Sequence, residues 1–330
     1  MKRKKLVSYA KYGYLFSIPF VLAFLMFMCY PTIYTMILGF TDLKGAGRTD
    51  FKFLTEIGKP WYQNYKEVLT AKTFKKAFSN TWILWGLSVI PEYLIAMTFA
   101  VWFTDRKLRL KGRGLFKILY YMPRIITGAA MATLFARLFG YPKGAINDLC
   151  NLVYGWFGLT RENFNYYAKE WSVKWVIILV NVYMYYGSTL VIMVSAIMGI
   201  DVEIFEAAEI DGANRIQTFF RVTLPCMRQM LIYMLVMSVI GGLNLYETPA
   251  MLIGIGCNNA GLTNLMYIQN QAFSGSYIYN RAAAASVILA LLCVGLSCII
   301  FFILRDKDEA KLKKIKRAAK REERRRLAAI

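Results

Sequence analysis

The chain of 330 residues is 57% hydrophobic and 15% aromatic, and it carries a formal net charge of +21 without a single histidine. The lack of histidine excludes Ser-His-Asp and Cys-His nucleophile schemes, imidazole proton relays and histidine-ligated metal sites. The apolar residues stand in long uncharged runs rather than at dispersed periodic positions, which excludes an ordinary soluble globular domain.

Six apolar runs are long enough to cross a membrane as helices, because a span needs about 20 mostly apolar residues. We therefore predict an all-α polytopic membrane protein with six transmembrane helices in a domain covering residues 12–304. The first run is too long for a signal peptide and ends without a small-residue cleavage site, so we expect it to be retained. The predicted spans lie near 14–40, 78–104, 116–139, 174–199, 229–253 and 282–304.

Basic residues are distributed unevenly between these spans. Most of the 41 Lys and Arg residues lie in segments 1–11, 105–117, 201–228 and 305–330. Because cytoplasmic segments carry an excess of Lys and Arg, this pattern predicts a cytoplasmic N-terminus at 1–11 and a basic cytoplasmic tail at 305–330. No aromatic residue accompanies the charges of the tail, which favours contact with lipid headgroups over binding of nucleic acid.

Three charged side chains in the predicted spans lie within two residues of a proline: Glu92, Arg124 and Glu247. Charged groups are costly in a membrane and by default face the interior of the helix bundle. A structural pairing among the three and a role in ligand binding both fit this pattern.

Polar and aromatic side chains also share faces of the fourth and fifth predicted spans. Planar polar groups beside aromatic rings suit a sugar, whereas hydrogen bonding between helices is the alternative explanation. The candidate residues of a substrate path are Asn181, Tyr183, Tyr185, Ser188, Asn244 and Glu247.

Residues 200–225 form an acid-rich loop between the fourth and fifth spans. Asp201 is a suitable N-cap for a short helix, and Gly212 is a suitable residue to end it in the left-handed conformation. A second short helix should lead to Pro225 in the first turn of the next span. A helix lying on the membrane would carry Lys and Arg on its polar face, so the acidic loop favours docking of another protein.

The sequence lacks the Gly-x-x-x-x-Gly-Lys-Ser/Thr loop that holds the phosphates of ATP. Gly58 and Lys59 are followed by Pro60 and have no upstream glycine in register. We therefore expect no enzymatic activity and no cofactor in this chain, so that the energy for active transport would come from another subunit.

The segment Glu206-Ala-Ala-x-x-Asp211-Gly212-Ala213, followed by Val-Thr-Leu-Pro225, resembles the EAA loop of ABC importer permeases of the carbohydrate branch, the maltose and oligosaccharide type. Weaker similarities, such as Tyr121-Met-Pro123, extend over most of the chain. The resemblance implies the type I ABC importer permease fold in the inner (cytoplasmic) membrane, with a coupling helix seated in a cleft of an ATPase. It implies these ATPase-coupling residues: Glu206, Ala207, Ala208, Asp211, Gly212, Ala213, Leu224 and Pro225.

The same resemblance implies the partners: a second EAA-bearing permease, two copies of a cytoplasmic ATPase that bind ATP and Mg, an extracytoplasmic solute-binding protein and membrane lipid. The implied function is translocation of a sugar or oligosaccharide by alternating access. A permease for glycerol phosphate or polyamine is the alternative, although only Arg124 and Arg137 lie in the spans to meet a phosphate. A membrane-embedded enzyme is disfavoured by the lack of histidine, and a passive channel has no use for a docking loop.

This chain departs from the family pattern at three points. Asp201 follows Ile200 where the family usually has Ile-Pro, and Cys257-Asn-Asn-Ala-Gly261 replaces a common Gly-Gly-Pro turn. Arg124 after Pro123 is unusual for a span.

Overall fold

The structure is a computed structural model and describes residues 10–105, 112–254, 256–275 and 277–304. Those residues are almost entirely helical, and among them the one pairing of extended segments is an isolated bridge between Thr41 and Phe53. The predicted all-α fold is confirmed. The basic tail from residue 305, the first nine residues and the basic segment 106–111 lie outside the described residues.

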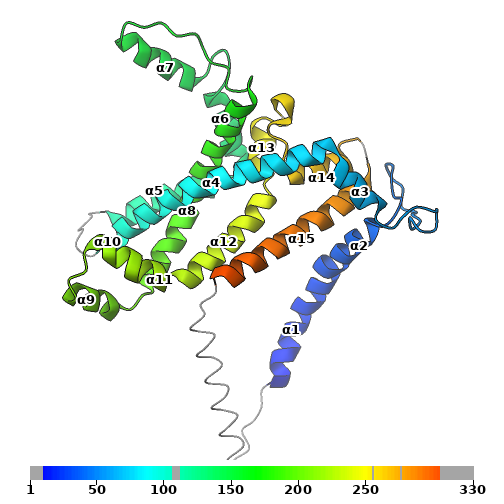
Figure 1. Ribbon diagram of the computed structural model, residues 1–330, viewed down its shortest axis with the longest axis horizontal. Helices are drawn as coiled ribbons and strands as arrows, with labels where there is room; N and C mark the ends of the chain where they lie inside the picture. Colours follow the sequence, from blue (N-terminus) through cyan, green and yellow to red (C-terminus); the bar gives the residue numbers. More distant parts are fainter. Residues whose placement is uncertain (1–9, 106–111, 255, 276, 305–330) are drawn as a thin grey trace, which may run out of the picture. The chain divides into compact units, whose positions relative to one another are not determined.

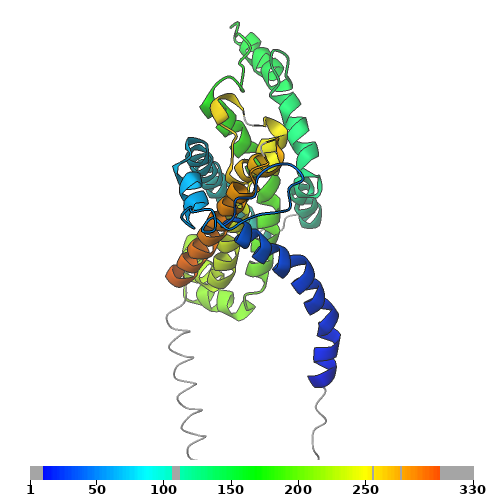
Figure 2. The same cartoon turned by 90° about the vertical axis from the view of Figure 1, so that its right-hand side faces the viewer.

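The described residues form two compact units, 10–79 with 263–291 and 80–262 with 292–304. In the first unit, α1 and α2 are joined by a π-helical stretch at Leu25–Cys29 and run on as one helical rod (blue in Figures 1 and 2). The helices of this unit are α1 (Ala10–Phe24), α2 (Tyr30–Leu38), α3 (Gln63–Thr70), the start of α4 (Lys72–Thr104), α14 (Asn264–Phe273) and the first part of α15 (Tyr279–Leu304).

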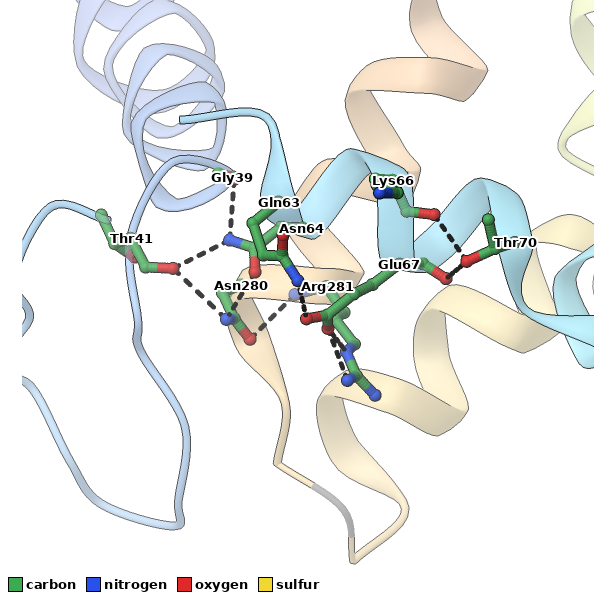
Figure 3. Close-up of polar contacts among 9 residues, drawn as sticks. All are labelled: Gly39, Thr41, Gln63, Asn64, Lys66, Glu67, Thr70, Asn280 and Arg281. Atoms are coloured by element: carbon green, nitrogen blue, oxygen red, sulfur yellow. Dashed lines mark hydrogen bonds and ion pairs between the residues drawn. The ribbon is translucent and has the colours of Figure 1, made fainter. Parts of the chain in front are cut away.

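Buried asparagines hold the first unit together at one end of α15 (Figure 3). Asn64 of α3 donates hydrogen bonds to the carbonyls of Gly39 and Thr41 at 2.9 and 2.8 Å. Asn280 of α15 donates to the Thr41 carbonyl at 3.3 Å and to Oδ1 of Asn64 at 3.0 Å. Both asparagines are almost fully buried, so these bonds compensate for the loss of hydration. They join α3, α15 and the turn after α2.

An ion pair at the edge of this cluster joins the same two helices. Nε of Arg281 lies 2.6 Å from the Glu67 carboxylate (Figure 3). Burial raises the pKa of Glu67, but hydrogen bonds from Gln63 and Arg281 together with the charge of Arg281 bring it below its ordinary value. Both side chains are about one-third exposed, so solvent limits the contribution of the pair to about 1 kcal/mol.

The second unit contains the remainder of α4 and α15 and all helices between α4 and α14 (Figure 1). Its central helix is α8, whose apolar side chains enter two buried clusters, one around Ile177 and Met184 and the other around Leu190 and Met193. The helices of this unit are α5 (Arg113–Ile125), α6 (Gly128–Leu138), α7 (Ala145–Trp156), α8 (Glu170–Met198), α9 (Val202–Ile210), α10 (Arg215–Thr218), α11 (Leu224–Cys226), α12 (Arg228–Leu243) and α13 (Glu247–Leu252).

Five helices in the described part of the chain are long and apolar enough to cross a membrane, or six if one bent pair of helices counts as a single span. The five are Lys11–Leu38, Lys72–Thr104, Glu170–Met198, Arg228–Leu252 and Tyr279–Leu304. Each begins and ends within about six residues of a predicted span.

The third predicted span, 116–139, is not one straight helix. Gly114–Ile125 and Gly128–Leu138 meet at an angle of 90°. Pro123 removes a backbone donor from the last turn of α5, and Ile126 adopts an extended conformation. Thr127 then starts a new helix, because its hydroxyl accepts a hydrogen bond from the Ala130 amide.

Candidate functional site

The loop between α8 and α12 begins with α9. One face of this helix packs against the rest of the protein, and the other faces are exposed. Phe205 and Ala208, three residues apart, point inward, with Phe205 packing against the cluster around Leu190 and Met193. Ala207 is exposed. The two alanines of the motif therefore lie on different faces, and only Ala207 remains open to a partner surface. Asp201 occupies the N-cap position but makes no side-chain capping bond.

The turn after α9 has the geometry that its sequence predicts. Asp211 is the C-cap residue, and Gly212 has a φ of +74°. The amides of Gly212 and Ala213 donate to the carbonyls of Glu209 and Ala208 at 3.1 and 3.0 Å. These bonds satisfy carbonyls that the helix leaves open at its end.

The second short helix, α10, begins with a capping box. The Asn214 side chain accepts a hydrogen bond from the Gln217 amide at 2.8 Å, and Oε1 of Gln217 accepts one from the Asn214 amide at 2.9 Å. Such reciprocal capping fixes the direction in which a helix starts. A π-helical stretch at Phe219–Thr223 and α11 follow. Pro225 lies in α11, before the candidate span that starts at Arg228, and not in the first turn of that span as predicted.

Large apolar side chains project from this loop. Ile210 is 87% exposed, Ile216 70% and Phe220 60%. The loop lies between two candidate spans, so exposure here marks a surface suited to another protein. The sequence reasoning missed Ile210 and Ile216, although two apolar residues flanking Gly212 at helix ends were a visible signal.

An ion pair ties the loop to the end of α4. Nε of Arg215 lies 3.5 Å from Oδ2 of Asp105.

The candidate substrate-path residues differ in their placement. Asn181 is buried at 4% exposure, and its side-chain oxygen has no hydrogen-bond partner in the described part of the chain. Ser188 donates back to the Tyr185 carbonyl at 2.8 Å, and Asn244 donates to the Ile240 carbonyl at 2.8 Å. Asn244 is nevertheless exposed, as is Tyr183.

Glu92, Arg124 and Glu247 contact different partners and form no ion pair with one another among the described residues. The guanidinium of Arg124 lies over the Tyr185 ring, 4.9 Å from its centroid. Glu92 accepts a hydrogen bond from the Thr189 hydroxyl at 2.5 Å. Glu247 lies against Gly128 at the start of α6.

An apolar groove of about 570 Å³ lies beside these residues. Tyr183 and Tyr186 of α8, Tyr120 of α5 and Pro91 of α4 are among the residues that line it. Its lining is mostly aliphatic and aromatic. In the described part of the chain, no group of three or more His, Cys, Asp or Glu residues is placed to hold a metal ion.

Over most of its length, the chain is similar in sequence to several proteins named as transport system permeases. It is 27% identical over 282 residues to an arabinooligosaccharides transport system permease protein, AraP, of Halalkalibacterium halodurans, covering 85% of this chain and 84% of that protein. It is 30% identical over 301 residues to a probable ABC transporter permease protein, YesP, of Bacillus subtilis, covering 88% and 89%. A lactose transport system permease protein, LacF, of Rhizobium radiobacter is 25% identical over 297 residues, covering 89% and 94%.

The fold matches that of a solved bacterial ABC transporter involved in the import of the acidic polysaccharide alginate. The TM-score is 0.74 at 21% sequence identity, with 89% of this chain and 95% of the other covered. At that identity the likeness establishes the fold, and it confirms the predicted permease architecture.

Residues 71–314 match the family described as binding-protein-dependent transport system inner membrane component. This range contains the loop of α9 to α11 and all of the candidate spans except Lys11–Leu38. A transport role, rather than an enzymatic one, therefore applies to the chain. It belongs to the binding-protein-dependent transport system inner membrane component family.

Proposed function

We propose that the chain is the permease subunit of an ATP-driven importer that translocates a sugar or oligosaccharide. The observation that carries the proposal is the projecting loop with exposed Ile210, Ile216 and Phe220 on a membrane-spanning protein of this family. The names of the relatives supply the substrate class, since two of those described above are permeases for arabinooligosaccharides and lactose.

We propose that the loop docks on a cytoplasmic ATPase, present in two copies, which binds ATP and Mg. An apolar centre with a polar surround is typical of protein–protein contacts. Glu206 and Ala207 are exposed on α9 next to this apolar surface, and the Arg215–Asp105 pair links it to a span. Closure of the ATPases on ATP would thus move the spans.

We further propose that a second EAA-bearing permease completes the pathway and that the family's binding protein delivers the solute from outside. One chain offers at most six spans in its described residues and one docking loop. Large apolar side chains exposed on the candidate spans, such as Trp102 and Trp175, are available for lipid or for a second permease.

Uptake by the reconstituted complex tests this function. The proteoliposomes contain the permease pair, the ATPases and trapped ATP, and the binding protein is added outside. They should accumulate at least one of lactose, arabinotriose or maltotriose. They should not accumulate glycerol 3-phosphate or spermidine, and vesicles without ATP serve as the control. Uptake of glycerol 3-phosphate or spermidine in place of every saccharide would show that the substrate is not a sugar.

We also propose that both termini are cytoplasmic, on the strength of the positive-inside pattern. Asp50→Cys and Glu203→Cys, each in a cysteine-free background, should then react differently with a membrane-impermeant maleimide. Position 50 should be labelled in intact cells and position 203 only after the membrane is opened. Labelling of position 203 from outside would reverse the orientation.

A further inference from the structure

Two interrupted helices meet in the second unit. The α5–α6 pair breaks at residues 126–127, and α12 is separated from α13 by residues 244–246. Glu247, the first residue of α13, lies against Gly128, the first residue of α6, closely enough that a Cβ on the glycine would collide with its carboxylate. In membrane transporters, interrupted helices are tolerated where they are buried in protein or line a cavity, and such breaks receive polar ligands.

The acidic side chains of Glu92 and Glu247 are each stabilised by a neighbouring group other than Arg124. Glu92 accepts its hydrogen bond from Thr189. The carboxylate of Glu247 is placed at the N-terminal end of the eleven-residue helix α6, where the helix dipole is positive. Neither acid forms an ion pair with Arg124 in the part of the chain that the structure describes.

Arg124 therefore has no ion-pair partner among these acids. It stands in the last turn of α5, next to the break, and is exposed. Its guanidinium carbon lies over the Tyr185 ring, 4.9 Å from the ring centroid, and a cation–π contact leaves hydrogen-bond donors of the guanidinium available for an acceptor. An uncompensated cation in a spanning segment is costly, so its presence points to a ligand.

We propose that Arg124, positioned over the Tyr185 ring, binds the carboxylate of an acidic saccharide as it passes the two helix breaks. The substrate class is then a sugar with an exocyclic carboxylate, such as a uronic acid unit. The planar fork of Arg fits a carboxylate through two parallel hydrogen bonds. A doubly charged phosphate ester would need more than the one cation next to the break. This inference rests on the proposed sugar transport and deepens it.

The test compares one saccharide with and without its charge. Proteoliposomes with the complete transporter, its binding protein and ATP are offered trigalacturonate or its methyl ester, which keeps the ring and removes the charge. Arg124→Gln should lower uptake of trigalacturonate about tenfold or more, which is the expected effect of losing a charge-assisted bond. Uptake of the methyl ester should change less than about twofold. Arg124→Lys should give an intermediate loss because lysine keeps the charge without the fork.

Arg137→Gln is the matched control, because Arg137 is an exposed arginine in the last turn of α6, at the far end from the break. It should leave the ratio of acid to ester uptake unchanged. If Arg124→Gln lowers both uptakes equally, or lowers the yield of the assembled complex, Arg124 has a structural role and the inference is wrong. It is also wrong if the wild type imports neutral saccharides but no trigalacturonate, and in that case the proposed sugar transport still stands. Import of non-sugars alone would contradict both the proposed sugar transport and the inference about Arg124.

Discussion

Replacing Gly212 with Asp is expected to abolish uptake while leaving the permease inserted in the membrane. Gly212 has a φ of +74°, and a residue with a Cβ costs about 1 kcal/mol or more in that conformation. No atom of the chain lies within 4 Å of the position that a Cβ would take, so the fold has room for the side chain. If the loop docks on an ATPase as proposed, the new carboxylate would face that partner and add to the negative charge of Asp211 and Glu209.

Gly158→Asp provides the matched control for this experiment. Gly158 has a φ of +69° and open space around its Cβ position, but it lies outside the docking loop. Both variants should reach the membrane in similar amounts, and only Gly212→Asp should lose uptake and bind its ATPase weakly in co-purification. Gly212→Ala should be milder, since it adds strain without charge. Wild-type uptake by Gly212→Asp would remove the loop from the coupling mechanism.

Local features of this loop could be predicted because they depend on neighbouring residues. A glycine after a short helix ends it for reasons of backbone sterics, and Gly212 does so in the structure. The burial of Ala208 could not be predicted, because it depends on how α9 packs against residues distant in the sequence. Phe205, on the same face of α9, packs against the cluster that contains Leu190. Alanine is small enough to fit either against a partner protein or in the protein's own core, so its identity alone does not distinguish the two.

The interior site shows the same division. The sequence marked Glu92, Arg124 and Glu247 as unusual, since each is an ionisable residue near a proline in an apolar run. It did not reveal that α5 and α6 meet at 90°, because hydropathy reports the length of an apolar run and not its direction. The contact of Arg124 with the Tyr185 ring depends on the crossing of α5 and α8.

Gly187→Ala is expected to destabilise the permease strongly, because the crossing of α5 and α8 depends on a missing side chain. A Cβ at position 187 would collide with the backbone carbonyl of Tyr120. Backbone cannot rotate aside as a side chain can, so the helices must separate. We expect a loss of about 2–3 kcal/mol, in the upper part of the range for overpacked cores, seen as a lower thermal midpoint of the purified complex and less protein in the membrane.

Gly295→Ala is the control, since Gly295 is also a glycine in a spanning helix but has no atom of the chain within 4 Å of its Cβ position. It should keep the thermal midpoint of the wild type. Equal behaviour of the two variants would mean that α5 and α8 do not approach as closely as the structure describes. The crossing at Gly187 also places Arg124 over Tyr185, two residues before that glycine along α8. Gly187→Ala should therefore lower the uptake of trigalacturonate more than that of its methyl ester in the complex that still assembles, because a displaced α5 moves the guanidinium off its ring while leaving the remaining path in place.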